Sequence, residues 1–161
     1  KFTPAKDFVY RTPDGVDIDG WYYLPPNFGP SKKYPMIVYY YGGTIPLSRE
    51  LETTYDLAMF AAQGYVAYSL NPRGTVGYGQ SFAADHLNAW GTKTSDDIIG
   101  AVKAFVAAPP FVDAKKIGCA VSADAHGPLR CCRQPCRDQL HLQLLGRGLL
   151  GYELQHGGLR R

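Results

Sequence analysis

The feature that most constrains this chain is the nine-residue run 35–43, in which six apolar or aromatic residues stand between a proline and a glycine pair. A short continuous run rich in β-branched and aromatic residues predicts a strand that is buried on both faces of a sheet. The terminal pair Gly42-Gly43 lets the backbone approach a ligand closely where the strand leaves the sheet. In open α/β sheets, ligands bind outside the carboxyl ends of central strands. The run therefore predicts a central strand that ends at a functional site.

The residues before and after this strand predict further sheet pairings. Apolar and polar residues alternate over 8–11 and 16–24, around the turn Pro13-Asp14-Gly15, which is typical of a β-hairpin. Apolar residues at helical spacing predict a helix over 49–63, and a buried strand follows over 65–70. A strand, helix and strand in this order imply parallel pairing of the two strands with a right-handed crossover.

The next part of the chain predicts two more helices and another strand. A short helix is expected over 80–88 and a longer one over 94–107, with Ser95 as its N-cap and Asp96 and Asp97 in its first turn. These two aspartates also resemble a pair of catalytic carboxylates. Their place at a helix start favours capping and dipole interactions instead.

Composition limits the classes of function. With 161 residues and 45% apolar residues, the chain is long enough for one domain with a sizeable core. Its net charge of +3 is too small and too scattered to predict a nucleic-acid surface. No apolar run approaches the roughly 20 residues that span a bilayer, so no membrane segment is expected. The sequence begins at Lys1 with neither a start Met nor a signal peptide, so we expect it to be part of a longer parent protein, cytoplasmic or exported.

Several short segments resemble the prolyl oligopeptidase family of serine peptidases, the group of the dipeptidyl peptidase IV-like and acylaminoacyl peptidases. They keep the family's order over about 115 residues, and they are 12–15, 20–25, 34–43, 62–65, 71–74, 77–80, 88–91, 96–97 and 116–119. The resemblance implies an α/β-hydrolase fold with a mostly parallel sheet, flanking helices and an N-terminal hairpin. It also implies hydrolysis of short peptides without a cofactor, and a parent that carries an N-terminal β-propeller.

Two residues are candidates for the site, Tyr41 through the resemblance and Arg73 through its position in the predicted sheet. Tyr41 matches the tyrosine before the glycine pair that the family uses as an oxyanion-hole donor, beside a backbone N–H after the serine. Arg73 follows the second central strand, where it meets a substrate carboxylate or anchors the loop by a salt bridge. In the family the strand at 116–119 runs into a Gly-x-Ser-x-Gly-Gly elbow that holds the nucleophile. Here Ser122 follows without those glycines, so we do not assign it as the nucleophile.

The last 42 residues differ in composition from the rest. Residues 120–161 contain six Arg and no Lys, and they lack Ile, Thr, Asn, Phe, Met and Trp. Residues 144–151 can be encoded by codons that, when read from their second base, give Tyr-Trp-Gly-Glu-Gly-Tyr-Trp. Shifted readings over 134–143 and 122–132 extend this peptide, and the joined peptide resembles the stretch that follows the elbow in the family. We interpret the tail as out of frame after the loss of roughly ten codons.

Metal binding by the tail is the other interpretation of its composition. Its potential ligands are Cys131, Cys132, Cys136, His126 and His141. Adjacent cysteines followed by a three-residue gap do not fit the common zinc spacings, so no metal site is predicted.

These observations lead to one prediction and one alternative. Residues 1–119 are predicted to form the N-terminal half of a peptidase domain, and 120–161 an aberrant tail. The chain is then a fragment of a serine peptidase that is inactive because its nucleophile elbow is missing. The alternative is a non-catalytic binding module that keeps the α/β-hydrolase scaffold.

Overall fold

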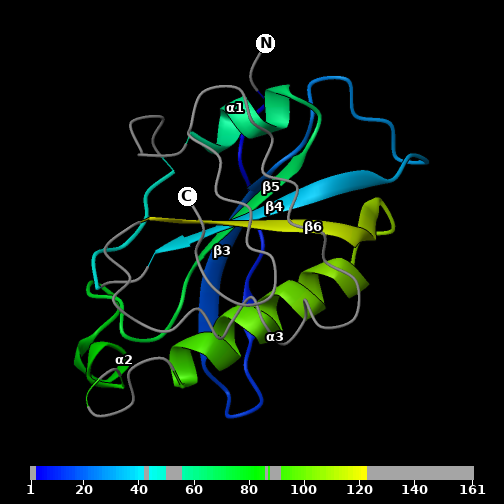
Figure 1. The fold of residues 1–161 in the computed structure, drawn as a ribbon. Helices are drawn as coiled ribbons and strands as arrows, with labels where there is room; N and C mark the ends of the chain where they lie inside the picture. The colour runs from blue at the N-terminus through cyan, green and yellow to red at the C-terminus, as the bar shows by residue number, and fades with distance from the viewer. Residues whose placement is uncertain (1–2, 42–43, 50–55, 86, 88–91, 123–161) are drawn as a thin grey trace, which may run out of the picture.

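The protein is described by a computed structural model that covers residues 3–41, 44–49, 56–85, 87 and 92–122. One mixed sheet forms its centre, with the strand order β1-β3-β5-β4-β6 and with β2 paired to β3 beside this path (Figure 1). The strands are β1 (Lys6–Asp7), β2 (Tyr10–Arg11), β3 (Asp17–Tyr23), β4 (Tyr34–Tyr41), β5 (Val66–Asn71) and β6 (Val112–Ser122). The helices are α1 (Leu57–Ala62), α2 (Gln80–Ala84) and α3 (Lys93–Ala107).

The strand pairing confirms the predicted hairpin and the predicted βαβ unit. β2 and β3 are antiparallel, and the turn between them is closed by a backbone hydrogen bond from Thr12 to Val16 of 2.8 Å. β4 lies between β5 and β6 and is parallel to both. β3 joins β5 in antiparallel orientation, so the sheet is mostly but not wholly parallel.

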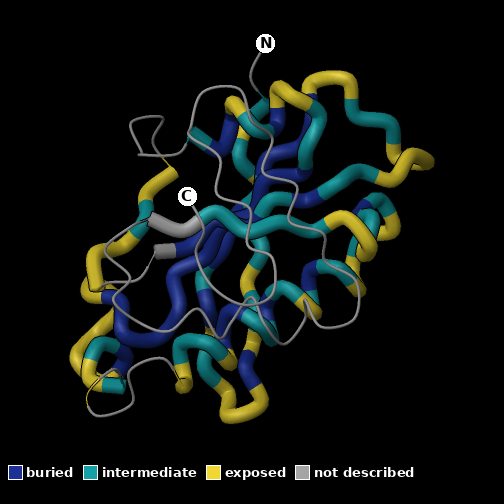
Figure 2. The backbone as a smooth tube through the Cα atoms, viewed as in Figure 1, coloured by how far each residue is buried: buried dark blue, intermediate teal, exposed yellow. Residues whose placement is uncertain are grey.

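The alternation of side chains along the strands creates a hydrophobic core on each face of the sheet. α3 covers one face, where Phe105 packs with Val38, Tyr68 and their neighbours, and α1 covers the other, where Leu57 packs with Trp21 and Tyr39 (Figure 1). The rings of Tyr68 and Phe105 are stacked with centroids 4.5 Å apart. Figure 2 shows buried residues concentrated in β3, β4 and β5, whereas β6 is mostly intermediate or exposed. The double-faced burial explains why β4 and β5 consist of nearly continuous apolar runs.

The predicted helix over 49–63 is wrong at its start. α1 begins at Leu57, after the N-cap Asp56, whose Oδ1 accepts a hydrogen bond of 2.8 Å from the backbone N–H of Ala58. Arg49 lies in a loop, and residues 50–55 are outside the described residues. The predicted stop is confirmed, because Gly64 adopts φ +97°, which favours glycine.

The predicted helix over 94–107 is confirmed, but its cap is not. α3 begins at Lys93 with Thr92 as N-cap, so Ser95 lies inside the helix. The extra residues at the start place Asp97 beyond the first turn, where it is buried. Asp96 remains in the first turn and is exposed, as the prediction of a dipole partner requires.

The ends of α2 and β6 differ from the predicted bounds. α2 ends at Ala84, earlier than the predicted 88, and residues 86 and 88–91 are outside the described residues. β6 continues through residues 120–122 without interruption. Residues 123–161, on which the out-of-frame hypothesis and the metal interpretation rest, lie outside the described residues. Within the described part, no helix is both long and apolar enough to cross a membrane.

Candidate active site at the carboxyl ends of the central strands

Three strands end together where the sequence predicts a functional site. Tyr41 is the last residue of β4, and its Cα is paired with that of Ser122, the last residue of β6. Asn71 ends β5 on the other side of β4. Because β5, β4 and β6 are parallel, all three ends lie on one edge of the sheet, which is where α/β proteins bind ligands. The predicted oxyanion residue therefore lies at the position that the fold uses for chemistry.

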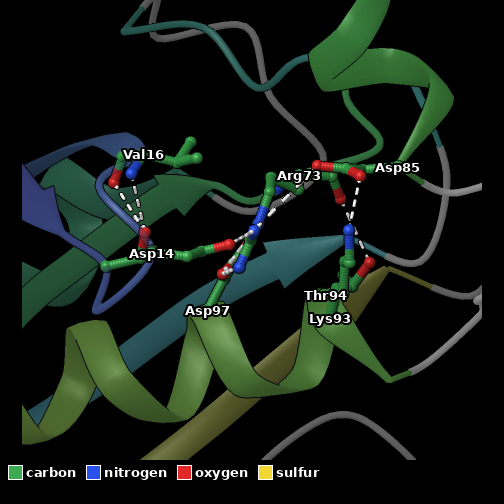
Figure 3. A network of polar contacts seen from close by, with 8 residues as sticks. Asp14, Val16, Arg73, Asp85, Lys93, Thr94 and Asp97 are labelled. Carbon is green, nitrogen blue, oxygen red and sulfur yellow. Dashed lines mark hydrogen bonds and ion pairs between the residues drawn. The ribbon is translucent and has the colours of Figure 1, made fainter.

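Arg73, two residues beyond β5, is held by carboxylates. Its Nε donates to Asp97 Oδ1 and Oδ2 at 3.1 and 2.9 Å, and its Nη2 donates to Asp97 Oδ1 at 2.7 Å (Figure 3). The backbone N–H of Arg73 donates to the same carboxylate at 3.0 Å. Only 7% of the Arg73 side chain and 1% of the Asp97 side chain are exposed. These hydrogen bonds raise the pKa of Arg73 above its ordinary value, so the guanidinium stays charged.

The remaining nitrogen of Arg73 faces two further carboxylates. Nη1 donates to Asp14 in the turn between β2 and β3, and it lies 3.9 Å from Asp85 Oδ2 at the end of α2 (Figure 3). Lys93 Nζ in turn donates to Asp85 Oδ1 at 2.6 Å. Arg73 thus joins the hairpin turn, the loop after β5, α2 and α3. These contacts favour the anchoring role over substrate binding, which remains a prediction.

Asp14, the most exposed carboxylate of this network, has a lowered pKa. A hydrogen bond with Thr12, followed by one from Arg73, holds the pKa of Asp14 below its ordinary value of 3.8. A carboxyl group with a lowered pKa stabilises the folded state above the ordinary value, and this contribution is lost as the pH falls through the folded-state pKa. The link between Asp14 and Arg73 therefore remains intact at neutral pH and breaks only in acid.

Sequence analysis missed the other polar cluster at this edge, which centres on Asn71. Asn71 is 2% exposed and bonds to both backbone groups of Leu47 and to the hydroxyl of Tyr78. A polar residue directly after a buried apolar run, with a proline next to it, is the signal that could have found it. No group of three or more His, Cys, Asp or Glu side chains that could hold a metal ion occurs in the described ranges.

The chain is similar to peptidases in sequence. Residues 51–120 match the model of the prolyl oligopeptidase family. The chain is 34% identical over 119 residues to a probable dipeptidyl-peptidase 5 of Aspergillus terreus, covering 73% of this chain and 16% of that protein. Dipeptidyl-peptidase 5 of Porphyromonas gingivalis is 34% identical over 118 residues, which cover 73% of this chain and 17% of that protein. The chain thus spans about a sixth of the length of these relatives.

Solved structures with the same fold are peptidases as well. The acylaminoacyl peptidase of Pyrococcus horikoshii superposes with a TM-score of 0.67 at 28% identity, over 78% of this chain and 20% of that chain. Dipeptidyl peptidase 4 of Porphyromonas gingivalis gives a TM-score of 0.63 at 28% identity, over 75% and 17% of the two chains. The predicted α/β-hydrolase fold class is thereby confirmed. Over residues 51–120, the chain therefore matches the prolyl oligopeptidase family of peptidases.

Proposed function

We propose that this chain contributes the oxyanion side of a serine peptidase site, with Tyr41 as the donor. The observation that carries the proposal is the register of β4 and β6, which pairs Tyr41 with Ser122 where both strands end. In an acyl-transfer reaction the carbonyl oxygen becomes an oxyanion when the nucleophile attacks. A phenol hydroxyl stabilises that charge as a neutral donor and brings no full counter-charge to the site.

The substrate class follows from the relatives. Their names describe a dipeptidyl-peptidase and an acylaminoacyl peptidase, so both are peptidases. We assign the same class, short peptides cleaved by acyl transfer, to the parent of this chain. Arg73 is assigned to anchoring of the loop after β5, because its donors bind Asp97 and Asp14.

We expect the chain as given to have no peptidase activity. Its sequence contains no Gly-x-Ser-x-Gly segment, because Ala120 and Asp124 stand where the motif has glycines on either side of the serine. Without a nucleophile, only a small residual effect of oxyanion stabilisation and binding remains. Purified, protease-free chain should release no chromophore from aminoacyl-proline or N-acyl-amino-acid p-nitroanilides. Turnover that scales with chain concentration would contradict the expected inactivity, and its loss in a Tyr41→Phe variant would show that it comes from this chain.

The binding-module alternative rests on a separate observation. β6 remains paired with β4 up to Ser122 although the elbow glycines are absent, so a scaffold without the elbow is compatible with an ordered sheet edge. A module of this kind would bind short peptides without cleaving them. Calorimetric titration with the aminoacyl-prolines and N-acyl amino acids that form part of these substrates separates the two functions. Saturable binding without turnover favours the module, and no binding favours the inactive fragment.

A further inference from the structure

The loop after β4 is attached to β5 through one side chain, Asn71. Its Oδ1 accepts the backbone N–H of Leu47 at 2.9 Å, and its Nδ2 donates to the carbonyl oxygen of Leu47 at 3.2 Å. This pair reproduces the reciprocal bonding of two paired strand residues, so Leu47 is held to the sheet although it lies outside any strand. We call these two bonds the Asn71 clasp.

The same carboxamide also reaches the loop after β5. The second hydrogen on Nδ2 is donated to Tyr78 Oη at 2.8 Å, and Tyr78 Oη donates to Asp19 Oδ2 of β3 at 2.9 Å. The carboxamide thus uses both donors and its acceptor. A buried polar group whose bonds are all satisfied fixes the geometry of its partners, because every alternative arrangement leaves one of them unpaired. Asn71 therefore joins the two loops that follow β4 and β5.

The other contacts of this loop lie on either side of the clasp. The backbone N–H of Val76 donates to the carbonyl oxygen of Thr44 at 2.8 Å. At the far end, Arg49 Nη2 donates to Asp7 Oδ1 at 2.7 Å and lies 3.3 Å from Asp19 Oδ1. Those ion pairs are partly exposed, and exposed pairs contribute little to stability. The hydrogen bond of 3.1 Å from buried Tyr23 Oη to the carbonyl oxygen of Arg49 holds the far end of the loop, and the clasp is the buried side-chain attachment at Leu47.

We infer that Asn71 is a positioning residue, which fixes the path of the chain after Tyr41-Gly42-Gly43 by holding Leu47 against the end of β5. The inference rests on the proposed function at one point, because it takes Tyr41, which precedes this segment, to be the oxyanion donor. Tyr41 ends β4 and Asn71 ends the neighbouring β5, so the clasp joins the segment that leaves the site to the rigid sheet. An oxyanion donor is effective when its surroundings hold it in place before the reaction, and the Asn71 clasp supplies such support to the segment after Tyr41.

The test is amide hydrogen exchange of the full chain, followed at Leu47. Asn71→Leu removes all three bonds at nearly constant volume, and it should lower the protection of residues 44–49 by about tenfold relative to the rest of the sheet. Ser69→Ala is the matched control, because Ser69 is equally buried in β5 and donates to the carbonyl oxygen of Tyr39 at 2.9 Å. Ser69→Ala should lower protection evenly, so the ratio of protection in residues 44–49 to protection in the sheet should stay unchanged.

A second variant gives a signature that a general loss of stability does not produce. In Asn71→Asp, the carboxylate present at high pH has no donor for Leu47, whereas the carboxylic acid present at low pH carries one O–H and restores the reciprocal pair. Burial and nearby Asp19 favour the acid form, and nearby Arg49 opposes it. The titratable groups linked to this position are Tyr78, which bonds to Asn71, Asp19, which bonds to Tyr78, and Arg49, which pairs with Asp19. Tyr23 and Asp56 line the pocket on the side of Leu47.

Protection at Leu47 in Asn71→Asp, taken relative to the native chain at the same pH, should therefore be low at pH 8 and recover by about pH 5. The inference is overturned if Asn71→Leu exchanges at Leu47 as the native chain does, if its loss is as uniform as that of Ser69→Ala, or if Asn71→Asp shows no recovery. None of these readings depends on catalysis. The effect of Tyr41→Phe on rate, described below, tests the proposed function separately.

Discussion

Replacing Asp97 by alanine is expected to lower the free energy of unfolding by about 3–5 kcal/mol, because a buried charge then loses its main partner. Asp97 accepts three hydrogen bonds from the side chain of Arg73 and one from its backbone N–H, and both side chains are buried. The remaining contacts of the guanidinium are to Asp14 and Asp85, which are more exposed. Urea unfolding of the native chain and of the variant measures the difference as a shift of the midpoint.

Two further variants make this result specific. Asp97→Asn keeps the shape and one acceptor oxygen but removes the charge, so its cost should be smaller, about 1–3 kcal/mol. Asp96→Ala changes the neighbouring exposed aspartate of α3 and should cost less than about 1 kcal/mol, since it acts on the helix dipole alone. Equal losses for Asp96→Ala and Asp97→Ala would contradict the role assigned to the Arg73–Asp97 pair.

The second large effect concerns Tyr41, and it is measured in a chimaera. Residues 1–119 replace the corresponding part of Porphyromonas gingivalis dipeptidyl-peptidase 5, which is 34% identical to this chain over 118 residues and supplies the rest of the peptidase. Tyr41→Phe should then lower kcat by about 10²–10³-fold, the cost of one oxyanion donor, equivalent to roughly 2.7–4 kcal/mol. KM should change little, because the oxyanion exists only after the nucleophile attacks.

The control for that experiment lies in the same strand. Tyr39 is buried in the core under α1, so Tyr39→Phe should leave kcat near that of the unmodified chimaera. A Tyr41→Phe chimaera with unchanged kcat would contradict the oxyanion role. A chimaera that unfolds cooperatively but is inactive even with Tyr41 would contradict the claim that residues 1–119 carry a working half of the site.

The backbone plan of this protein could be predicted from local patterns. The continuous apolar runs of β4 and β5 predict the two central strands of the sheet. Gly64 predicts the end of α1, and its φ of +97° is one that glycine adopts readily. The start of α1 was less predictable. Arg49 fits the helical spacing, yet it leaves the helix because its side chain and carbonyl oxygen bind groups of β3, and such tertiary contacts have no local signature.

The polar contacts of the site depend on the same kind of distant partner. The sequence predicts that Asp97 lies at a helix start, but its structural role is the contact with Arg73, which lies 24 residues away. The Asn71 clasp likewise joins residues 24 positions apart. Periodicity predicts which residues are buried, but it does not predict which buried polar groups bond to each other. The sequence could therefore indicate candidate residues at this edge, but not their hydrogen-bonded partners.

The measurement that tests the central claim most directly is labelling of the native chain with a fluorophosphonate probe, mapped by peptide mass spectrometry. The probe modifies serines that are activated as nucleophiles. Because the sequence lacks the nucleophile elbow, we predict no labelling of the chain, while full-length dipeptidyl-peptidase 5 of Porphyromonas gingivalis is labelled in parallel as the positive control. Stoichiometric labelling at Ser122 that is lost in Ser122→Ala would contradict the account, because it would show that the chain holds an activated nucleophile beside Tyr41.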